Sequence, residues 1–171
     1  IKVSQMFDDL KQTVRDWNDE DEIRRYIERI VDKEAFDKAG LVYGIGHAVY
    51  SLSDPRARIL KQWTEKLARE KGFEREFKLY AAVERIAPEV IQSKRKMYKG
   101  VSANIDFYSG LMYRMLNLPE ELFTPLFAAA RLAGWSAHRV EELVNGGKII
   151  RPAYKSVMPY KEYVPMDKRS S

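Results

Sequence analysis

Residues 19–31, DEDEIRRYIERIV, carry the pattern that decides the fold. Apolar side chains recur in this stretch at spacings of three and four residues, which is the repeat of an amphipathic α-helix. They are Ile23, Tyr26, Ile27, Ile30 and Val31. Asp19, with Glu22 three residues later, forms an acidic helix start of the capping-box kind. The stretch therefore predicts a helix that starts behind Asn18 and Asp19 and buries one face.

The same repeat extends in both directions along the chain. On the N-terminal side, Leu10, Val14 and Trp17 form a first apolar stripe. On the C-terminal side, Asp54 is placed to cap a helix whose first residue is Pro55, and Gly72 is placed to end it. The apolar positions of this helix are Ile59, Leu60, Trp63 and Leu67.

Three further helices are predicted toward the C-terminus. The first covers residues 74–87 and is closed by Pro88, because proline usually ends a helix. The second begins at residues 104–106, ends at Pro119 and buries Tyr108, Leu111, Met112 and Met115. The third begins at Thr124 and Pro125 and ends at Gly146 and Gly147. The sequence shows no convincing strand pair and no internal repeat, so the predicted fold class is all-α.

The composition excludes several classes of protein. With 171 residues, 45% of them hydrophobic, the chain has enough apolar material for a core and is not a disordered tail. No run approaches the roughly 18 apolar residues of a membrane span. Without cysteine and with two histidines, it offers no disulfide and few ligands for a metal, so we expect no metal centre. Chemistry must rest on histidine, carboxylates and arginine.

The charge and the first residues bear on partners and location. A net charge of +5 suits an anionic partner, but nucleic-acid binding would need Lys and Arg clustered on one face. The first five residues, IKVSQ, form no basic and apolar signal segment, so nothing supports secretion and we expect a cytoplasmic protein.

The helix predicted from residue 124 contains the most unusual polar residue. Arg131 stands among alanines and large apolar residues, so the helix is expected to be buried and the guanidinium to need an anion. That anion is a carboxylate of the same protein or a ligand's carboxylate or phosphate. His138 lies two turns farther along the same face, where an ordinary helix histidine remains the simpler interpretation.

Three more residues are candidates for chemistry. His47 ends the glycine loop Gly44-Ile45-Gly46, from which a histidine can donate a hydrogen bond to a carbonyl oxygen. Arg56 lies in the first turn of the helix capped by Asp54, where free backbone N–H groups favour an anion. Asp106 lies at a helix start, where an ionised carboxylate can act as a general base. The alternatives are a solvated loop histidine, an exposed arginine and a simple helix cap.

Taken together, these blocks resemble the citrate synthase family, which includes the 2-methylcitrate synthases. The resemblance rests on four motifs in order: GIGHAVY with DPRA at residues 44–57, NIDFYSG at 104–110, FTPLF leading to Arg131, and GW with AH at 134–138. It extends to Arg151-Pro152 and covers about residues 40 to 165. It implies an all-α fold with a small domain, residues 1–112, and the C-terminal helices of a large domain, residues 113–171.

The resemblance implies a Claisen condensation of acetyl-CoA with oxaloacetate, with no metal and no bound cofactor beyond the coenzyme A of the cosubstrate. Asp106 would remove the methyl proton, and His47 would polarise the oxaloacetate carbonyl. Arg56, Arg131 and Arg151 would hold substrate carboxylates, Arg151 across the interface of a homodimer. The backbone of one loop would lie against the adenine of CoA, and that loop is Leu41, Val42, Tyr43, Gly44, Ile45 and Gly46.

The chain also departs from the family pattern. The family's other catalytic histidine is absent, because it would stand just before the first helix, and His138 does not replace it. We therefore expect a C-terminal portion of such an enzyme that is inactive alone. The alternatives are a 2-methylcitrate synthase that uses propionyl-CoA and a folded fragment without catalysis.

Overall fold

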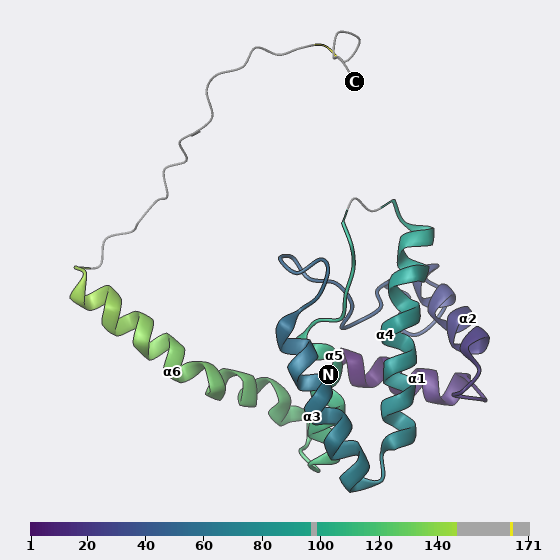
Figure 1. The fold of residues 1–171 in the computed structure, drawn as a ribbon, viewed down its shortest axis with the longest axis horizontal. Helices are drawn as coiled ribbons and strands as arrows, with labels where there is room; N and C mark the ends of the chain where they lie inside the picture. Colours follow the sequence, from purple (N-terminus) through teal and green to yellow (C-terminus); the bar gives the residue numbers. More distant parts are fainter. Residues whose placement is uncertain (97–98, 147–164, 166–171) are drawn as a thin grey trace. The chain divides into compact units, whose positions relative to one another are not determined.

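The computed structural model describes residues 1–96, 99–146 and 165, and within them it confirms the all-α prediction. The described residues form helices joined by loops, with one isolated bridge between Ile45 and Ala103 and no strand (Figure 1). The helices are α1 (Lys2–Thr13), α2 (Glu20–Val31), α3 (Pro55–Lys71), α4 (Glu74–Lys94), α5 (Ile105–Met115), the 3-10 turn η1 (Glu120–Leu122) and α6 (Phe123–Val144).

The chain divides into two compact units, residues 1–129 and residues 130–171. The first unit contains α1 to α5, and the second contains most of α6. None of the described helices combines the length and the apolar character needed to cross a membrane.

The core of the first unit lies between α1, α2, α4 and α5. Helix α2 packs on α4, α3 packs on α5 and α4, and α1 packs on α5 and α2. At the centre, the rings of Phe7 and Tyr80 stack with centroids 3.4 Å apart, and the Phe107 ring meets both edge-on. All three side chains are buried, so the start of α5 is anchored in the middle of the core.

The helix starts follow the sequence prediction, with one correction. Asp19 caps α2 by accepting hydrogen bonds from the backbone N–H groups of Asp21 and Glu22. Glu22 does not complete a capping box, because its carboxylate accepts from the backbone N–H groups of Arg15 and Asp16 instead. The carboxylate of Glu22 thus links the first turn of α2 to the residues that connect α1 and α2.

Helix α3 has the predicted ends, but of its predicted apolar face only Leu60 and Leu67 pack against the core. Asp54 caps it, Pro55 opens it and Gly72 ends it with a φ of 76°. Ile59 and Trp63 are more than half exposed, at 59% and 58%, and the buried residues are Ala57, Thr64 and Ala68. Small side chains face the core because α5 and α4 pack closely on this helix.

The prediction that Pro88 closes a helix is wrong, since α4 continues through it to Lys94. Proline removes one backbone donor, at a cost of about 3 kcal/mol in a helix interior. On both sides of Pro88 the helix buries apolar side chains against α2, namely Ile86, Ala87, Val90 and Ile91. Burial on this scale offsets the missing hydrogen bond.

The prediction that the last long helix is buried is also wrong for this chain. Leu132 and Trp135 are more than half exposed, at 58% and 55%, and Arg131 is exposed as well. In α6 only Phe123, at the first position, is buried. An apolar pattern shows that a helix favours burial, but it does not show that the covering surface belongs to the same chain.

Candidate functional site

The glycine loop before His47 is held against the start of α5 by backbone hydrogen bonds. The N–H of Gly46 donates to the Ser102 carbonyl at 2.8 Å, and the N–H of Asn104 donates to the Gly44 carbonyl at 2.9 Å. Gly44 has a φ of +83°, and a Cβ placed there would lie 3.0 Å from the Cα of Phe107. Only glycine fits this approach, so the loop and the helix start form one framework.

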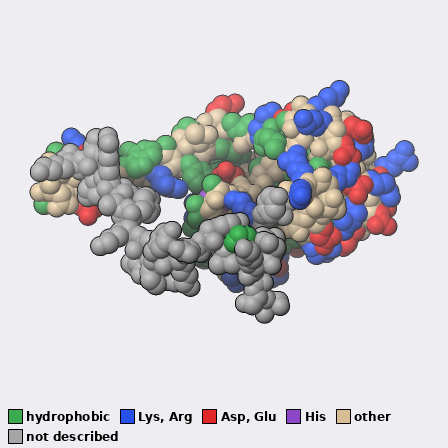
Figure 2. Space-filling model, turned by 90° about the horizontal axis from the view of Figure 1, so that it is seen from above, with side chains coloured by type: hydrophobic (Ala, Val, Ile, Leu, Met, Phe, Trp, Pro, Cys, Tyr) green, Lys and Arg blue, Asp and Glu red, His purple; other side chains and the backbone are tan. Residues whose placement is uncertain are grey.

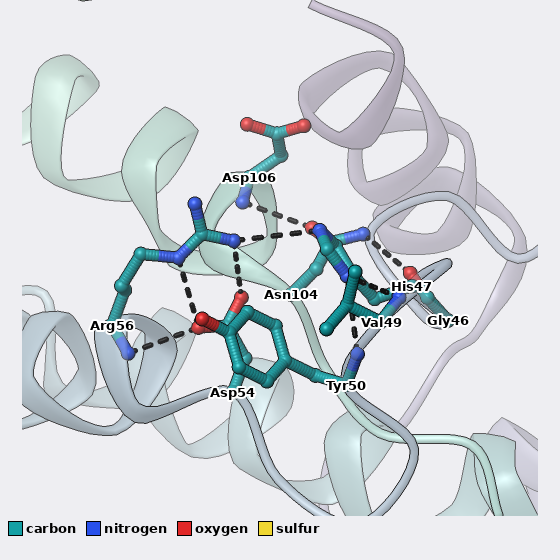
Figure 3. A network of polar contacts seen from close by, with 8 residues as sticks. All are labelled: Gly46, His47, Val49, Tyr50, Asp54, Arg56, Asn104 and Asp106. Carbon is teal, nitrogen blue, oxygen red and sulfur yellow. Dashed lines mark hydrogen bonds and ion pairs between the residues drawn. The ribbon is translucent and has the colours of Figure 1, made fainter. Parts of the chain in front are cut away.

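Hydrogen bonds fix the tautomer of His47. Its Nδ1 accepts from the backbone N–H groups of Val49, at 3.0 Å, and Tyr50, at 3.2 Å (Figure 3). A nitrogen that accepts two donors carries no proton, so in the neutral ring the hydrogen sits on Nε2. His47 therefore offers an N–H donor on the side of the ring away from its own loop.

A carboxylate holds Arg56. Asp54, whose side chain is fully buried, accepts from Nε of Arg56 at 3.0 Å and from Nη2 at 2.8 Å. The hydrogen bonds from Arg56 are the main reason that the pKa of the Asp54 carboxyl is lowered, and the same pair raises the pKa of Arg56. The ring of Tyr50 lies 5.3 Å from the guanidinium carbon. Arg56 therefore lies in the predicted first turn, where its charge is paired with Asp54.

The two donors meet in one place. Nη2 of Arg56 lies 3.5 Å from Nε2 of His47, and Figure 3 shows Arg56 between Asp54 and His47. Because both atoms carry hydrogens, they do not satisfy each other. An oxygen atom of a carbonyl or carboxylate group is the natural acceptor for such a pair.

Asp106 stands at the first turn of α5 beside a cavity. Its backbone N–H is accepted by the Asn104 side chain at 2.9 Å, and its carboxylate is exposed and points away from the Asp54–Arg56 pair in Figure 3. The carboxylate borders a cavity of about 340 Å³, which is lined by the first turn of α1 and by aromatic side chains such as Tyr113 and Phe127. Burial is the main cause that raises the pKa of Tyr113, and the charge of Asp106 adds to it.

The preceding loop is anchored by side chains. Val42 is buried, Leu41 is exposed, and the Tyr43 hydroxyl donates to Asp37 at 2.7 Å. That hydrogen bond is the main cause that lowers the pKa of Asp37. Burial of Val42 and the hydrogen bond of Tyr43 therefore fix the backbone at the start of the segment that leads to Gly46.

The structure brings together some of the residues singled out in the sequence. His47, Arg56, Asp106 and residues 41–46 all belong to the first unit. Arg131 is exposed in the second unit, and Arg151 lies outside the described residues. The His138 side chain is 85% exposed, 3.8 Å from Glu141, as expected of an ordinary helix histidine.

Three residues contribute to the site in ways that the sequence interpretation missed. Asn104 links the loop to α5, Tyr50 lies over Arg56, and Lys99 donates to the His47 and Ala48 carbonyls at 3.4 and 3.2 Å. A polar residue two positions before Asp106 is a recognisable cap, which could have pointed to Asn104. No sequence signal distinguishes the contacts of Tyr50 or Lys99.

On the side seen in Figure 2, Lys and Arg side chains are interspersed with Asp and Glu. Within the described part of the chain, no group of three or more His, Asp or Glu side chains is arranged to hold a metal ion.

Several known proteins are similar to this chain. The chain is 39% identical to a citrate synthase of Synechocystis sp. over 149 residues, which are 86% of this chain and 34% of that protein. It is 38% identical to a 2-methylcitrate synthase of Shewanella oneidensis over 70% of this chain and 30% of that protein. The crystal structure of citrate synthase from Pyrobaculum aerophilum matches 93% of this chain and 38% of its own, with 30% identity and a TM-score of 0.58.

The extent of the match is as informative as its strength. The chain spans about a third of the length of the curated relatives it matches. A family model described as "Citrate synthase, C-terminal domain" matches residues 1–153, which include the glycine loop, His47, Arg56 and Asp106. The chain therefore belongs to the citrate synthase family.

Proposed function

We propose that this chain supplies part of the active site for a condensation of acetyl-CoA with oxaloacetate that yields citrate and CoA. The observation that carries the proposal is the pair of donors, Nε2 of His47 and Nη2 of Arg56, 3.5 Å apart. A ketone flanked by carboxylates presents the oxygen atoms that such a pair binds. The carboxylate of Asp106, at the edge of a cavity, is available as a base.

The proposed reaction begins at Asp106. Its carboxylate removes a proton from the methyl carbon of the thioester, and the electron pair of the broken C–H bond forms an enolate. The cavity beside Asp106 offers space for the acyl group.

Carbon–carbon bond formation then needs an electrophilic ketone. The enolate carbon attacks the ketone carbon of oxaloacetate, and the ketone oxygen takes the proton of His47 Nε2 as the carbonyl π bond breaks. Exchange with solvent then returns a proton to His47 Nε2 and removes the one on Asp106, which restores both groups. The resulting citryl thioester is hydrolysed by water, which gives citrate and the CoA thiol. Fixed donors aimed at the developing alkoxide provide much of such an acceleration.

Further residues are proposed for binding. Arg56, Arg131 and Arg151 hold substrate carboxylates, with Arg151 contributed across the interface of a homodimer. The backbone of residues 41–46 lies against the adenine of CoA. The site is proposed to work without a metal, in a cytoplasmic enzyme.

The remaining groups are proposed to lie outside this chain. Because the relatives are about three times as long, we propose that a second histidine and further CoA contacts come from the rest of such a protein, and that residues 1–171 alone are inactive. The similarity to a 2-methylcitrate synthase supports propionyl-CoA as the second candidate for the acyl substrate.

The test is the release of CoA from acetyl-CoA or propionyl-CoA with oxaloacetate. It is measured on residues 1–171 and on the intact polypeptide, which is the proposed longer protein that contains these residues together with the remaining groups of the site. Asp106→Asn should lower kcat by about 100-fold or more, because a general base typically contributes a factor of 10² to 10⁴. The Kd of the Asp106→Asn variant for oxaloacetate should stay nearly unchanged. Asp21→Asn, in the first turn of α2, is the matched control and should leave both constants unchanged. Equal loss of kcat and of binding in Asp106→Asn would overturn the assignment.

A further inference from the structure

The side chain of Asn104 connects the two parts of the site. Its Nδ2 donates to the Gly46 carbonyl at 2.9 Å, and its Oδ1 accepts from the Asp106 N–H at 2.9 Å. Its backbone N–H donates to the Gly44 carbonyl at 2.9 Å. One residue thus contacts the peptide that precedes His47 and the residue that carries the proposed base (Figure 3).

The chemistry of the two partners fixes the orientation of this amide. The Gly46 carbonyl can only accept a hydrogen bond, and the Asp106 N–H can only donate one. An amide satisfies both at once, with its NH₂ group toward the loop and its oxygen toward the helix. An aspartate in this position would lack the donor, and a serine is too short to reach both partners.

None of the side chains from Ala48 to Leu52, directly after His47, is buried. Val49 is 76% exposed, Leu52 is 90% exposed, and Ala48 is exposed as well. Lys99 approaches the carbonyls of His47 and Ala48 at longer range, 3.4 and 3.2 Å, from an exposed position. The conformation of His47 therefore depends on hydrogen bonds. Among the described residues, the bond from Asn104 to the Gly46 carbonyl is shorter than the side-chain bonds from Lys99, and the Gly46 N–H donates to the Ser102 carbonyl at 2.8 Å.

We propose that Asn104 is a positioning residue that sets the placement of His47 relative to Asp106. The catalytic consequence of this inference rests on the proposed function. The placement of His47 by Asn104 does not depend on that function. The amide holds the Gly46–His47 peptide, and this places the ring so that Nδ1 meets the N–H groups of Val49 and Tyr50. The same amide caps α5 and orients its first turn.

Two variants separate the cap from the contact with the loop. Asn104→Asp keeps an acceptor for the Asp106 N–H, since aspartate caps helices about as well as asparagine. It replaces the donor to Gly46 by a charged oxygen that repels that carbonyl. Asn104→Ser keeps a neutral capping hydroxyl and also loses the loop contact. Both variants should fold, and their midpoints of thermal unfolding should stay within a few degrees of the parent.

The first measurement is ¹⁵N NMR of the His47 imidazole in residues 1–171, without substrate. The parent chain should show an unprotonated Nδ1 and a protonated Nε2. In both variants the two ¹⁵N signals should move toward each other, as expected when the ring exchanges between tautomers. The second measurement is condensation by the intact polypeptide. Its kcat should fall by about 10- to 100-fold in both variants, the loss that a small displacement of reacting groups produces, while KM for oxaloacetate changes less.

The outcomes distinguish this inference from the proposed function. If both variants keep the parent's ¹⁵N pattern and kcat, the positioning role is wrong. If only Asn104→Asp differs, added charge is responsible and the role is also wrong. If the ¹⁵N pattern changes in both variants but the intact parent does not catalyse the condensation, the proposed function fails and the placement of His47 by Asn104 stands.

Discussion

At the scale of single residues, the buried carboxylate of Asp54 determines what Arg56 can do. Two of the guanidinium nitrogens, Nε and Nη2, are used by Asp54, and the Arg56 backbone N–H donates to the same carboxylate at 3.0 Å. The remaining guanidinium hydrogens are left for a ligand. A guanidinium fixed in this way loses little conformational entropy when an anion binds.

Asp54→Asn should destabilise the chain by about 1–3 kcal/mol. Asparagine retains the cap but removes the charge that pairs with Arg56, and hydrogen bonds to charged groups are worth about that much. The Arg56 side chain is 39% exposed, so solvent screening favours the lower end. Urea unfolding at pH 7 gives the free energy of unfolding. Asp19→Asn is the control, because Asp19 caps α2 from an exposed position and pairs with no arginine among the described residues. An equal effect of both substitutions would show that the loss comes from removing a negative charge at a helix start and not from the pair with Arg56.

Single residues were predictable where local chemistry decides their role. Asp54 and His47 could be picked out because capping residues and glycine loops have short-range sequence signatures, and Asp106 because it lies in the first turn of a predicted helix. The pairing of Arg56 with Asp54 was missed, although both belong to one motif, because sequence spacing does not show which way a first-turn side chain folds. The bond from Asn104 to Gly46 spans 58 residues and leaves no sequence trace.

At the scale of elements, the junction between the glycine loop and α5 depends on close backbone contact. Gly44 lies against Phe107, whose ring is buried in the core. The loop therefore takes its position from the same helix start that carries Asp106. Any side chain at residue 44 would have to push the loop away from α5.

Gly44→Ala should destabilise the chain by about 2–5 kcal/mol. Alanine at a φ of +83° costs roughly 1–2 kcal/mol, and overlap with Phe107 adds about 1–3 kcal/mol. Gly72→Ala is the matched control, since Gly72 has a φ of +76° and nothing within 4 Å of the added Cβ. Gly72→Ala should lower the free energy of unfolding only by the backbone contribution, about 1–2 kcal/mol. Thermal or urea unfolding of the two variants measures the difference, and equal losses would contradict the contact with Phe107.

Elements were predicted well where their ends are marked and less well where packing overrides local preference. The caps of α2 and α3 and the end of α3 at Gly72 agree with the sequence. Helix α4 passes through Pro88 because its apolar face is buried on both sides of that residue. Local rules describe the loss of one hydrogen bond, but not the burial that offsets it.

At the scale of the whole molecule, the sequence predicted the all-α class but not which surfaces the chain covers by itself. Residues of α6 such as Trp135 and Leu143 are 55% and 62% exposed despite their apolar character. Arg131 was expected to be buried for the same reason. Periodicity reports the environment that a helix favours, whereas exposure depends on every segment that packs against it.

Ionic contacts across the first unit make its stability sensitive to acid. Arg114 on α5 donates to both carboxylate oxygens of Asp8 on α1 and to Glu120 in η1 at 2.7 Å. The hydrogen bond from Arg114 is the main cause that lowers the pKa of Asp8 below its usual value. A carboxyl group whose pKa is lower in the folded state stabilises the fold above its unfolded pKa, about 3.9, and this stabilisation is lost as the pH falls through the folded pKa.

Asp8→Asn should therefore destabilise the chain at pH 7 and have little effect at pH 2. The expected loss at pH 7 is about 1 kcal/mol, because the Asp8 side chain is 41% exposed and solvent screens the pair. Urea unfolding of the parent and the variant at pH 7, 5, 4, 3 and 2 gives the difference in free energy of unfolding at each pH. The difference should be constant from pH 7 to 5 and shrink below about pH 4. Glu121→Gln, an exposed carboxylate beside Glu120, should show almost no difference at any pH. If the Asp8→Asn difference persisted unchanged at pH 2, the lost stability would come from packing and not from the ion pair that links α1 to α5.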